Sequence, residues 1–155
     1  MLAQYAFKAA PYPKSSDLVA LFKAEAGPEH QELIEDLFEK ITLVDLKATA
    51  AKTRRLPDGQ WETTFTVDAR KFHADGKGKE TAAALAATID VGLFTVEPGQ
   101  KGYAKRDVLR VERHAVRTGT QQVVLRSAER PKFAGIDPYN KWIDRNSEDN
   151  LTKVE

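Results

Sequence analysis

Two short amphipathic segments form the first clear pattern of apolar and polar positions in the chain. Leu18, Leu21 and Phe22 share one helical face behind the potential capping oxygens of residues 15–17, which predicts a helix over residues 16–26. Gly27 and Pro28 suit the junction to a second helix. The apolar positions of that second helix recur with the spacing of one wide face, and they are Leu33, Ile34, Leu37, Phe38 and Ile41. We expect a helix hairpin whose apolar face packs on the strands downstream or on a neighbouring helical domain.

From residue 41 onward the apolar positions recur at every second residue, as in a strand with one buried face. Leu46, Ala48 and Ala50 alternate with polar residues, and the alternation resumes over 61–69 after a turn at 57–59. The apolar or buried set of the second run is Trp61, Thr63, Phe65, Val67 and Ala69. These patterns predict a long hairpin.

The remaining strands are short and joined by turns. Turn residues occupy 75–78, the alanine-rich stretch 82–87 is read as strand or loop, and a strand is predicted over 89–96. After a loop at 98–102, residues 108–115 predict a strand with Leu109, Val111 and Ala115 on its buried face, paired in a second hairpin with 122–126. About six strands without intervening helices predict a mainly β fold, an antiparallel β-sandwich of immunoglobulin-like type. We therefore divide the chain into a helical lead-in, 1–40, and a β-sandwich domain, 41–155.

The segment 133–150 is irregular and carries apolar anchors among short polar side chains. We expect Phe133, Ile136, Trp142 and Ile143 to be structural or interface anchors, together with Asp137 and Asp144. The spacing of Asp144, Asn146, Glu148, Asn150 and Glu155 matches a twelve-residue calcium loop, but Asp149 stands where that loop needs glycine and no exit helix follows. These side chains are better explained as turn caps that accept hydrogen bonds from nearby backbone amides.

Composition excludes several classes of function. The 155 residues include 24 basic and 23 acidic side chains and no cysteine, with a net charge of +1. A balanced charge provides no field that would attract nucleic acid or an anionic membrane. The lack of cysteine excludes a disulfide framework, a thiolate zinc site and a cysteine nucleophile. No apolar run is long enough to span a bilayer, and the first residues do not resemble a signal peptide.

Candidate catalytic residues are scattered and lack a recognisable spacing. His30, His73 and His114 form no His-Glu-x-x-His pair, although a site assembled from all three in space stays open. The glycines around Lys77 make half of a phosphate-loop motif, but they lie between predicted strands, where a hairpin loop is the better explanation. We predict no catalytic, cofactor-binding or metal-binding residue in this chain.

Three stretches nevertheless carry a family resemblance: residues 33–43, the loop 71–80, and 134–146 with its Gly-Ile-Asp-Pro-Tyr-Asn sequence. Together they resemble the C-terminal region of bacterial aminopeptidase N-like zinc metallopeptidases, of the subgroup associated with transporter-permease-like membrane segments. The resemblance covers residues 15–155. In that family the catalytic domain has a His-Glu-x-x-His motif and a Gly-x-Met-Glu-Asn motif, and this chain has neither, so no catalytic role carries over.

The resemblance implies a non-catalytic accessory domain that packs on, and positions, the catalytic or helical domain of a larger membrane-associated protein. It implies partners within the parent polypeptide, zinc only in that parent, and a soluble domain whose membrane side stays open, with the extracytoplasmic side favoured. The alternative from the residues alone is an immunoglobulin-like module whose sheet edge or acidic tail recognises a peptide, a sugar or a cation.

Overall fold

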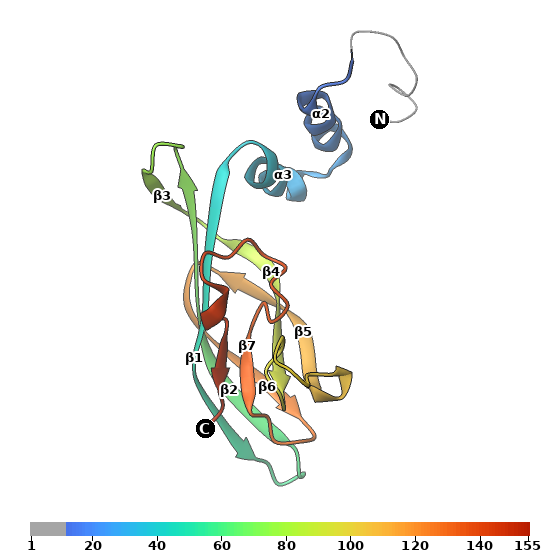
Figure 1. Cartoon of the computed structure of the whole chain (residues 1–155), viewed down its shortest axis with the longest axis vertical. Coiled ribbons are helices and arrows are strands. Elements are labelled where there is room, and N and C mark those ends of the chain that lie inside the picture. The colour runs from blue at the N-terminus through green and yellow to red at the C-terminus, as the bar shows by residue number, and fades with distance from the viewer. Residues whose placement is uncertain (1–11) are drawn as a thin grey trace. The chain divides into compact units, whose positions relative to one another are not determined.

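The computed structural model describes residues 12–155, which form two short helices followed by two packed antiparallel sheets of four strands each (Figure 1). This confirms the predicted mainly β class and the antiparallel sandwich. The described residues divide into two compact units, one of residues 12–42 and 74–79, the other of residues 43–73 and 80–155. The first eleven residues of the predicted helical lead-in lie outside the described part.

The first unit contains the helices α2 (Ser15–Glu25), η1 (Pro28–His30) and α3 (Gln31–Phe38). The Asp17 carboxylate accepts a hydrogen bond from the Lys14 backbone amide and so caps the start of α2. The prediction that Ile41 belongs to the face of the second helix was wrong. The backbone amides of residues 39 and 40 both donate to the Glu35 carbonyl, which ends the helix, and Ile41 begins the first strand.

The predicted long hairpin is confirmed as β1 (Ile41–Arg55) and β2 (Trp61–Ala74). The Leu56 amide donates to the Gln60 carbonyl across the turn, and Gly59 adopts φ 86°, which only glycine accepts readily. The predicted buried position of Ala50 was wrong. Ala50 has φ 50° and is exposed, and this shift of the alternation by one residue buries Ala51 instead.

The other elements complete two sheets, β1-β2-β3 with β6 also paired to β2, and β5-β4-β7-β8. Their bounds are β3 (Glu80–Ala83), β4 (Ala86–Phe94), η2 (Lys105–Asp107), β5 (Val108–Arg117), β6 (Gly119–Ser127), β7 (Phe133–Ile136), η3 (Ser147–Asp149) and β8 (Leu151–Lys153). The prediction that 108–115 and 122–126 form a hairpin was wrong, because β5 pairs with β4 and β6 pairs with β2. Gly119, with φ 102°, lies where the chain passes from one sheet to the other.

The buried side of β5 also differs from the prediction. Ala115 is exposed and Val116 is buried, because the register places Val116 opposite Ala87, on the side of β4 that faces the core, and Ala115 opposite the exposed Thr88. The β4–β5 register has one irregularity, at the start of β5, where Phe94 pairs with Val108 and Leu93 pairs with Arg110. The sequence pattern of β5 alone contains no sign of this irregularity.

The C-terminal end joins one edge of the sandwich. The Glu155 amide donates to the Ala51 carbonyl, and the Thr53 amide donates to the Glu155 carbonyl. The Val154 amide donates to the Lys132 carbonyl. The last residues therefore bridge β1 to the other sheet and cover an edge that would otherwise present free backbone groups.

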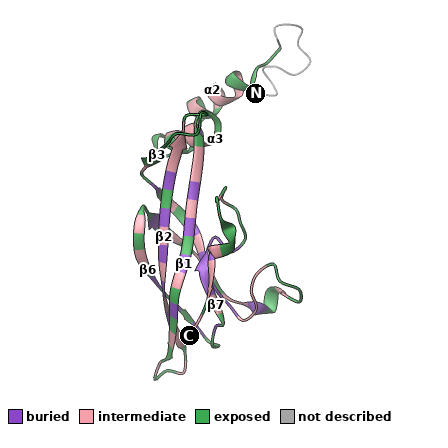
Figure 2. Cartoon of the chain, turned by 60° about the vertical axis from the view of Figure 1, so that its left-hand side comes forward, coloured by how far each residue is buried: buried purple, intermediate pink, exposed green. Residues whose placement is uncertain are grey.

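The apolar core lies within the second unit, between the sheets. Its largest buried side chains include Phe65, Leu46, Ile89, Leu93 and Ile136. Figure 2 shows buried positions repeating along β1 and β2, whereas α2 and α3 are mostly intermediate or exposed. The apolar side chains of the sandwich are therefore mostly buried, whereas those of the helices remain accessible to solvent.

Candidate functional site

The predicted anchors of the C-terminal segment differ in their environments. Ile136 is fully buried in β7, Phe133 is half-buried opposite Phe94, and Trp142 is half-buried against the core. Ile143 is 74% exposed, so it does not pack on the sandwich. Of the two roles predicted for Ile143, structural or interface anchor, only contact with a partner remains.

Asp137 organises the turn that follows β7. Its side chain is buried, its φ is 42°, and its carboxylate accepts hydrogen bonds from the Lys141 amide at 3.0 Å and from the Trp142 amide at 2.9 Å. Its own amide donates to the Asp90 carbonyl at 2.7 Å. Asp137, predicted as an anchor, therefore caps two backbone amides. The predicted turn capping is confirmed for Asp144, whose Oδ1 accepts a hydrogen bond from the Asn146 amide at 3.2 Å. It was wrong for Asn150, whose side-chain oxygen and nitrogen are buried without a partner.

A pocket of about 350 Å³ lies beside this turn, lined by Thr88, Asp90, Arg113, Asp137, Lys141 and Trp142. The Lys141 ammonium donates to the Asp90 carboxylate at 2.6 Å. That hydrogen bond, reinforced by the charge of Asp90, raises the pKa of Lys141 above its usual range. A lysine held in its protonated form is a poor nucleophile, so Lys141 contributes a paired charge to this pocket, and Trp142 contributes an aromatic wall.

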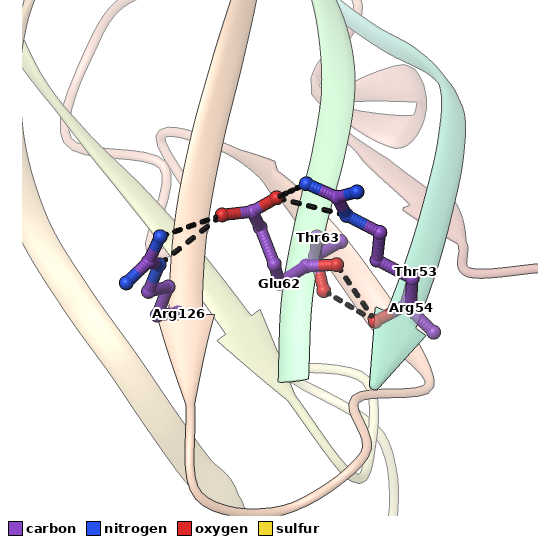
Figure 3. Close-up of polar contacts among 5 residues, drawn as sticks. All are labelled: Thr53, Arg54, Glu62, Thr63 and Arg126. Atoms are coloured by element: carbon purple, nitrogen blue, oxygen red, sulfur yellow. Dashed lines mark hydrogen bonds and ion pairs between the residues drawn. The ribbon is translucent and has the colours of Figure 1, made fainter. Parts of the chain in front are cut away.

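A second polar cluster crosses three strands of the other sheet. Glu62 on β2 lies between Arg54 on β1 and Arg126 on β6, as Figure 3 shows. Arg54 donates to one carboxylate oxygen through Nε at 3.0 Å and Nη2 at 2.5 Å, and Arg126 donates to the other oxygen at 3.1 and 3.0 Å. Hydrogen bonds from Arg54 and then Arg126 lower the pKa of Glu62. The carboxylate stays ionised and paired, so it serves as a link between strands rather than as a general acid.

The same cluster contains a pair of threonines, of which Thr63 is buried. The hydroxyl oxygens of Thr53 and Thr63 lie 2.9 Å apart, and Thr63 is fully buried (Figure 3). The Thr53 hydroxyl also lies 3.2 Å from the Glu62 carbonyl. These contacts satisfy the buried hydroxyls and fix the β1–β2 register.

The histidines are found on three different elements. His30 ends η1, His73 lies on β2, and His114 lies on β5. Across residues 12–155, no group of three or more histidine, aspartate or glutamate side chains is arranged to hold a metal ion. Within the described residues, the three histidines are therefore not arranged as a metal site.

The two helices of the first unit carry several exposed apolar side chains. We call Phe22, Leu33, Leu37 and Phe38 the helix apolar surface; their exposed fractions are 42, 47, 58 and 50%. Phe22 and Phe38 contact each other with ring centroids 5.6 Å apart. Polar contacts hold the helices together as well, because the Lys23 ammonium donates to Glu39 at 2.6 Å and the Gln31 amide donates to two carbonyls of the α2 end. The helix pair is thus fixed while its apolar residues remain accessible.

Sequence reasoning found the apolar helix positions but missed the Glu62 cluster. The pairing of Arg54 with Glu62 follows from the hairpin turn, since the two residues flank it on adjacent strands. The pairing with Arg126 required knowledge that β6 lies beside β2, 64 residues away in sequence. No local signal carries that information.

Comparisons with known proteins add no family assignment. No protein-family model, no curated protein and no solved structure matches the chain. Among the described residues, no helix combines the length and the hydrophobicity needed to cross a bilayer.

Proposed function

We propose that this chain is a non-catalytic accessory domain that packs through its helices on the catalytic or helical domain of a larger, membrane-associated zinc aminopeptidase-like protein. The sandwich is the self-sufficient part of the domain, and the helices provide the docking surface. The parent polypeptide is the partner, and it supplies the zinc and the catalytic residues.

The observation that carries this proposal is the helix apolar surface. Large apolar side chains on α2 and α3 are close to half exposed or more, and in the two helices only Ile34 is buried. Several exposed large apolar side chains on one pair of helices are typical of an interaction site. Helices this short gain most of their stability from tertiary packing, and so they need a partner for that face.

Two further points support an accessory role. The polar clusters around Glu62 and Lys141 consist of groups that are already paired, so neither presents an activated acid, base or nucleophile. The resemblance of residues 15–155 to the region that follows the catalytic domain in zinc aminopeptidases names the partner. In that arrangement a helical region continues into a β-sandwich, which is the order of elements in this chain.

The test begins with the genomic reading frame that encodes the chain. We expect a His-Glu-x-x-His sequence upstream in the same frame. The upstream region is then produced as a separate protein and titrated with this chain by isothermal titration calorimetry. Binding should be saturable, and Leu37→Glu should weaken it at least about tenfold, since a charge in a desolvated apolar contact costs more than about 1.4 kcal/mol.

The matched control is Val124→Glu, because Val124 on β6 is 53% exposed and apolar like Leu37 but lies in the other unit. It should leave the affinity unchanged. The proposal fails if the frame encodes no metallopeptidase domain, or if both variants weaken binding equally.

A further inference from the structure

The buried polar atoms without hydrogen-bond partners are concentrated in one turn of the C-terminal segment. Across residues 12–155, four buried side-chain atoms lack a partner: Asp144 Oδ2, Asp149 Oδ1, and Oδ1 and Nδ2 of Asn150. All four lie within seven consecutive residues. Buried polar groups are nearly always satisfied, so such a concentration requires an explanation.

The fold holds these side chains firmly along β1. Asp144 Oδ1 accepts hydrogen bonds from the Leu46 amide at 3.3 Å and from the Asn146 amide at 3.2 Å, which leaves Oδ2 as the second oxygen of a fixed carboxylate. Asp149 Oδ2 lies 3.5 Å from the ammonium of Lys47, the next residue of β1, while Oδ1 is buried without a partner. The two carboxylates are therefore tied to adjacent positions of one strand.

Asn150 is the buried member of the group. Its exposed fraction is 1%, and its backbone carbonyl accepts a hydrogen bond from the Ile136 amide at 3.0 Å, which holds its backbone against β7. Neither the oxygen nor the nitrogen of its side-chain amide has a hydrogen-bond partner. An amide that is buried and unsatisfied costs free energy unless a further group binds there.

The atoms that lack partners are chiefly oxygens. Asp144 Oδ2, Asp149 Oδ1 and Asn150 Oδ1 are hard ligands, and the two carboxylates carry two negative charges that the single Lys47 ammonium offsets only in part. Ca²⁺ accepts six to eight oxygen ligands in flexible geometry, whereas Mg²⁺ demands a near-ideal octahedron. An irregular turn with three protein oxygens fits Ca²⁺ with water in the remaining positions.

We propose that Asp144, Asp149 and Asn150 form a calcium site that fastens the C-terminal segment to β1. Two carboxylates and one amide make a weak site, and we expect a dissociation constant of about 10⁻⁴ to 10⁻³ M, the range of extracellular calcium modules. The site does not depend on the proposed accessory function, and either proposal can fail alone.

The experiment uses the purified chain, freed of metal with a chelator and dialysed. Thermal unfolding is followed while CaCl₂ is raised to about 10 mM, with MgCl₂ at matched ionic strength as the control for screening. A ligand selective for the folded state should raise the unfolding temperature saturably, by about 3 to 6 °C. Terbium luminescence gives a second readout, because Trp142 is two residues from Asp144 and can sensitise a bound lanthanide.

Three variants separate a site from a general acidic effect. Asp149→Asn keeps the side-chain volume and leaves the contacts of Asp144 intact, and it should weaken Ca²⁺ binding at least about tenfold. Glu148→Gln removes a charge from an exposed neighbour in the same turn and should leave binding unchanged. Asn150→Asp adds a third carboxylate and should tighten binding, and it decides the matter if Asp149→Asn fails to fold.

The proposal is overturned if no saturable response to Ca²⁺ occurs, if MgCl₂ produces an equal shift, or if Asp149→Asn and Glu148→Gln behave alike. An Asn150→Asp variant that binds no more tightly than the parent chain would also overturn it.

Discussion

The two units of this chain differ in how far their phenylalanine side chains are buried. Phe65 of the sandwich is fully buried, whereas Phe38 of the helical unit is 50% exposed although it contacts Phe22. The sandwich therefore contains a buried apolar core of its own, whereas the helices leave large apolar side chains exposed to solvent. The comparison teaches that amphipathic helices in a sequence can indicate an interface as well as a core.

The largest expected effect tests this contrast directly. Phe65→Ala removes a fully buried ring from the core and should lower the free energy of unfolding by about 3 to 5 kcal/mol. Phe38→Ala in the same chain should cost less than about 1 kcal/mol, because its ring is already half in water. Denaturant unfolding measures both. If both substitutions lowered the free energy of unfolding equally, the helices would belong to the same cooperative core as the sandwich, which would contradict this contrast.

A smaller effect is expected from the turn after β7. Asp137→Ala should lower the free energy of unfolding by about 2 to 4 kcal/mol, because the amides of Lys141 and Trp142 lose their hydrogen-bond acceptor. Asp137→Asn tolerates the positive φ and keeps one of the two acceptor oxygens, but it places an NH2 group against the second amide, so it should cost less than Asp137→Ala. If both substitutions cost the same, capping of the turn requires both carboxylate oxygens.

Trp142 and Ile143 give a contrast within one segment. Trp142→Ala should cost about 1 to 3 kcal/mol, below the range for a fully buried tryptophan, because the ring is half-buried against the core. Ile143→Ala should change the stability by less than about 0.5 kcal/mol, since Ile143 is 74% exposed. A large cost for Ile143 would contradict its assignment as a residue available to a partner.

The smallest effect concerns the pH dependence of the sandwich. Because Arg54 and Arg126 lower the pKa of Glu62, the contribution of this carboxylate is fully present above the unfolded pKa of about 4.3 and is lost as the pH falls through the folded pKa. The stability difference between the parent chain and Glu62→Gln should therefore shrink as the pH is lowered below 4. Urea unfolding at several pH values measures it, and a difference that is constant with pH would exclude the linkage.

The sequence predicts those parts of the fold that local patterns encode. The alternation before and after the turn at Gly59 defines β1 and β2, and the spacing of Leu33, Leu37 and Phe38 defines α3. Tertiary pairing decides the rest. The shift at Ala50, the burial of Val116 in place of Ala115, and the separation of β5 and β6 into different sheets follow from strand pairing that no local window contains.

The candidate site was predictable to a similar extent. Turn capping by Asp137 follows from its residue type, because aspartate side chains commonly accept hydrogen bonds from nearby backbone amides. The periodicity of the helices left open whether their apolar face packs on the strands or on another domain, and the structure shows that face exposed. The burial of Asn150 was not predictable, because it depends on close packing of its backbone against Gly135 on β7. Because Asn150 is buried, its side-chain oxygen and nitrogen lack hydrogen-bond partners, as do one oxygen each of Asp144 and Asp149.

Hydrogen exchange of the chain alone and of its parent polypeptide tests the docking role most directly. In the chain alone, amides of α2 and α3 should exchange far faster than those of β2 and β4, because helices with an uncovered apolar face open at low free energy. In the parent polypeptide the same helix amides should become protected, while those of β2 and β4 stay as they were. Helix amides that exchange as slowly as the sandwich in the chain alone, or that gain no protection in the parent, would contradict the account.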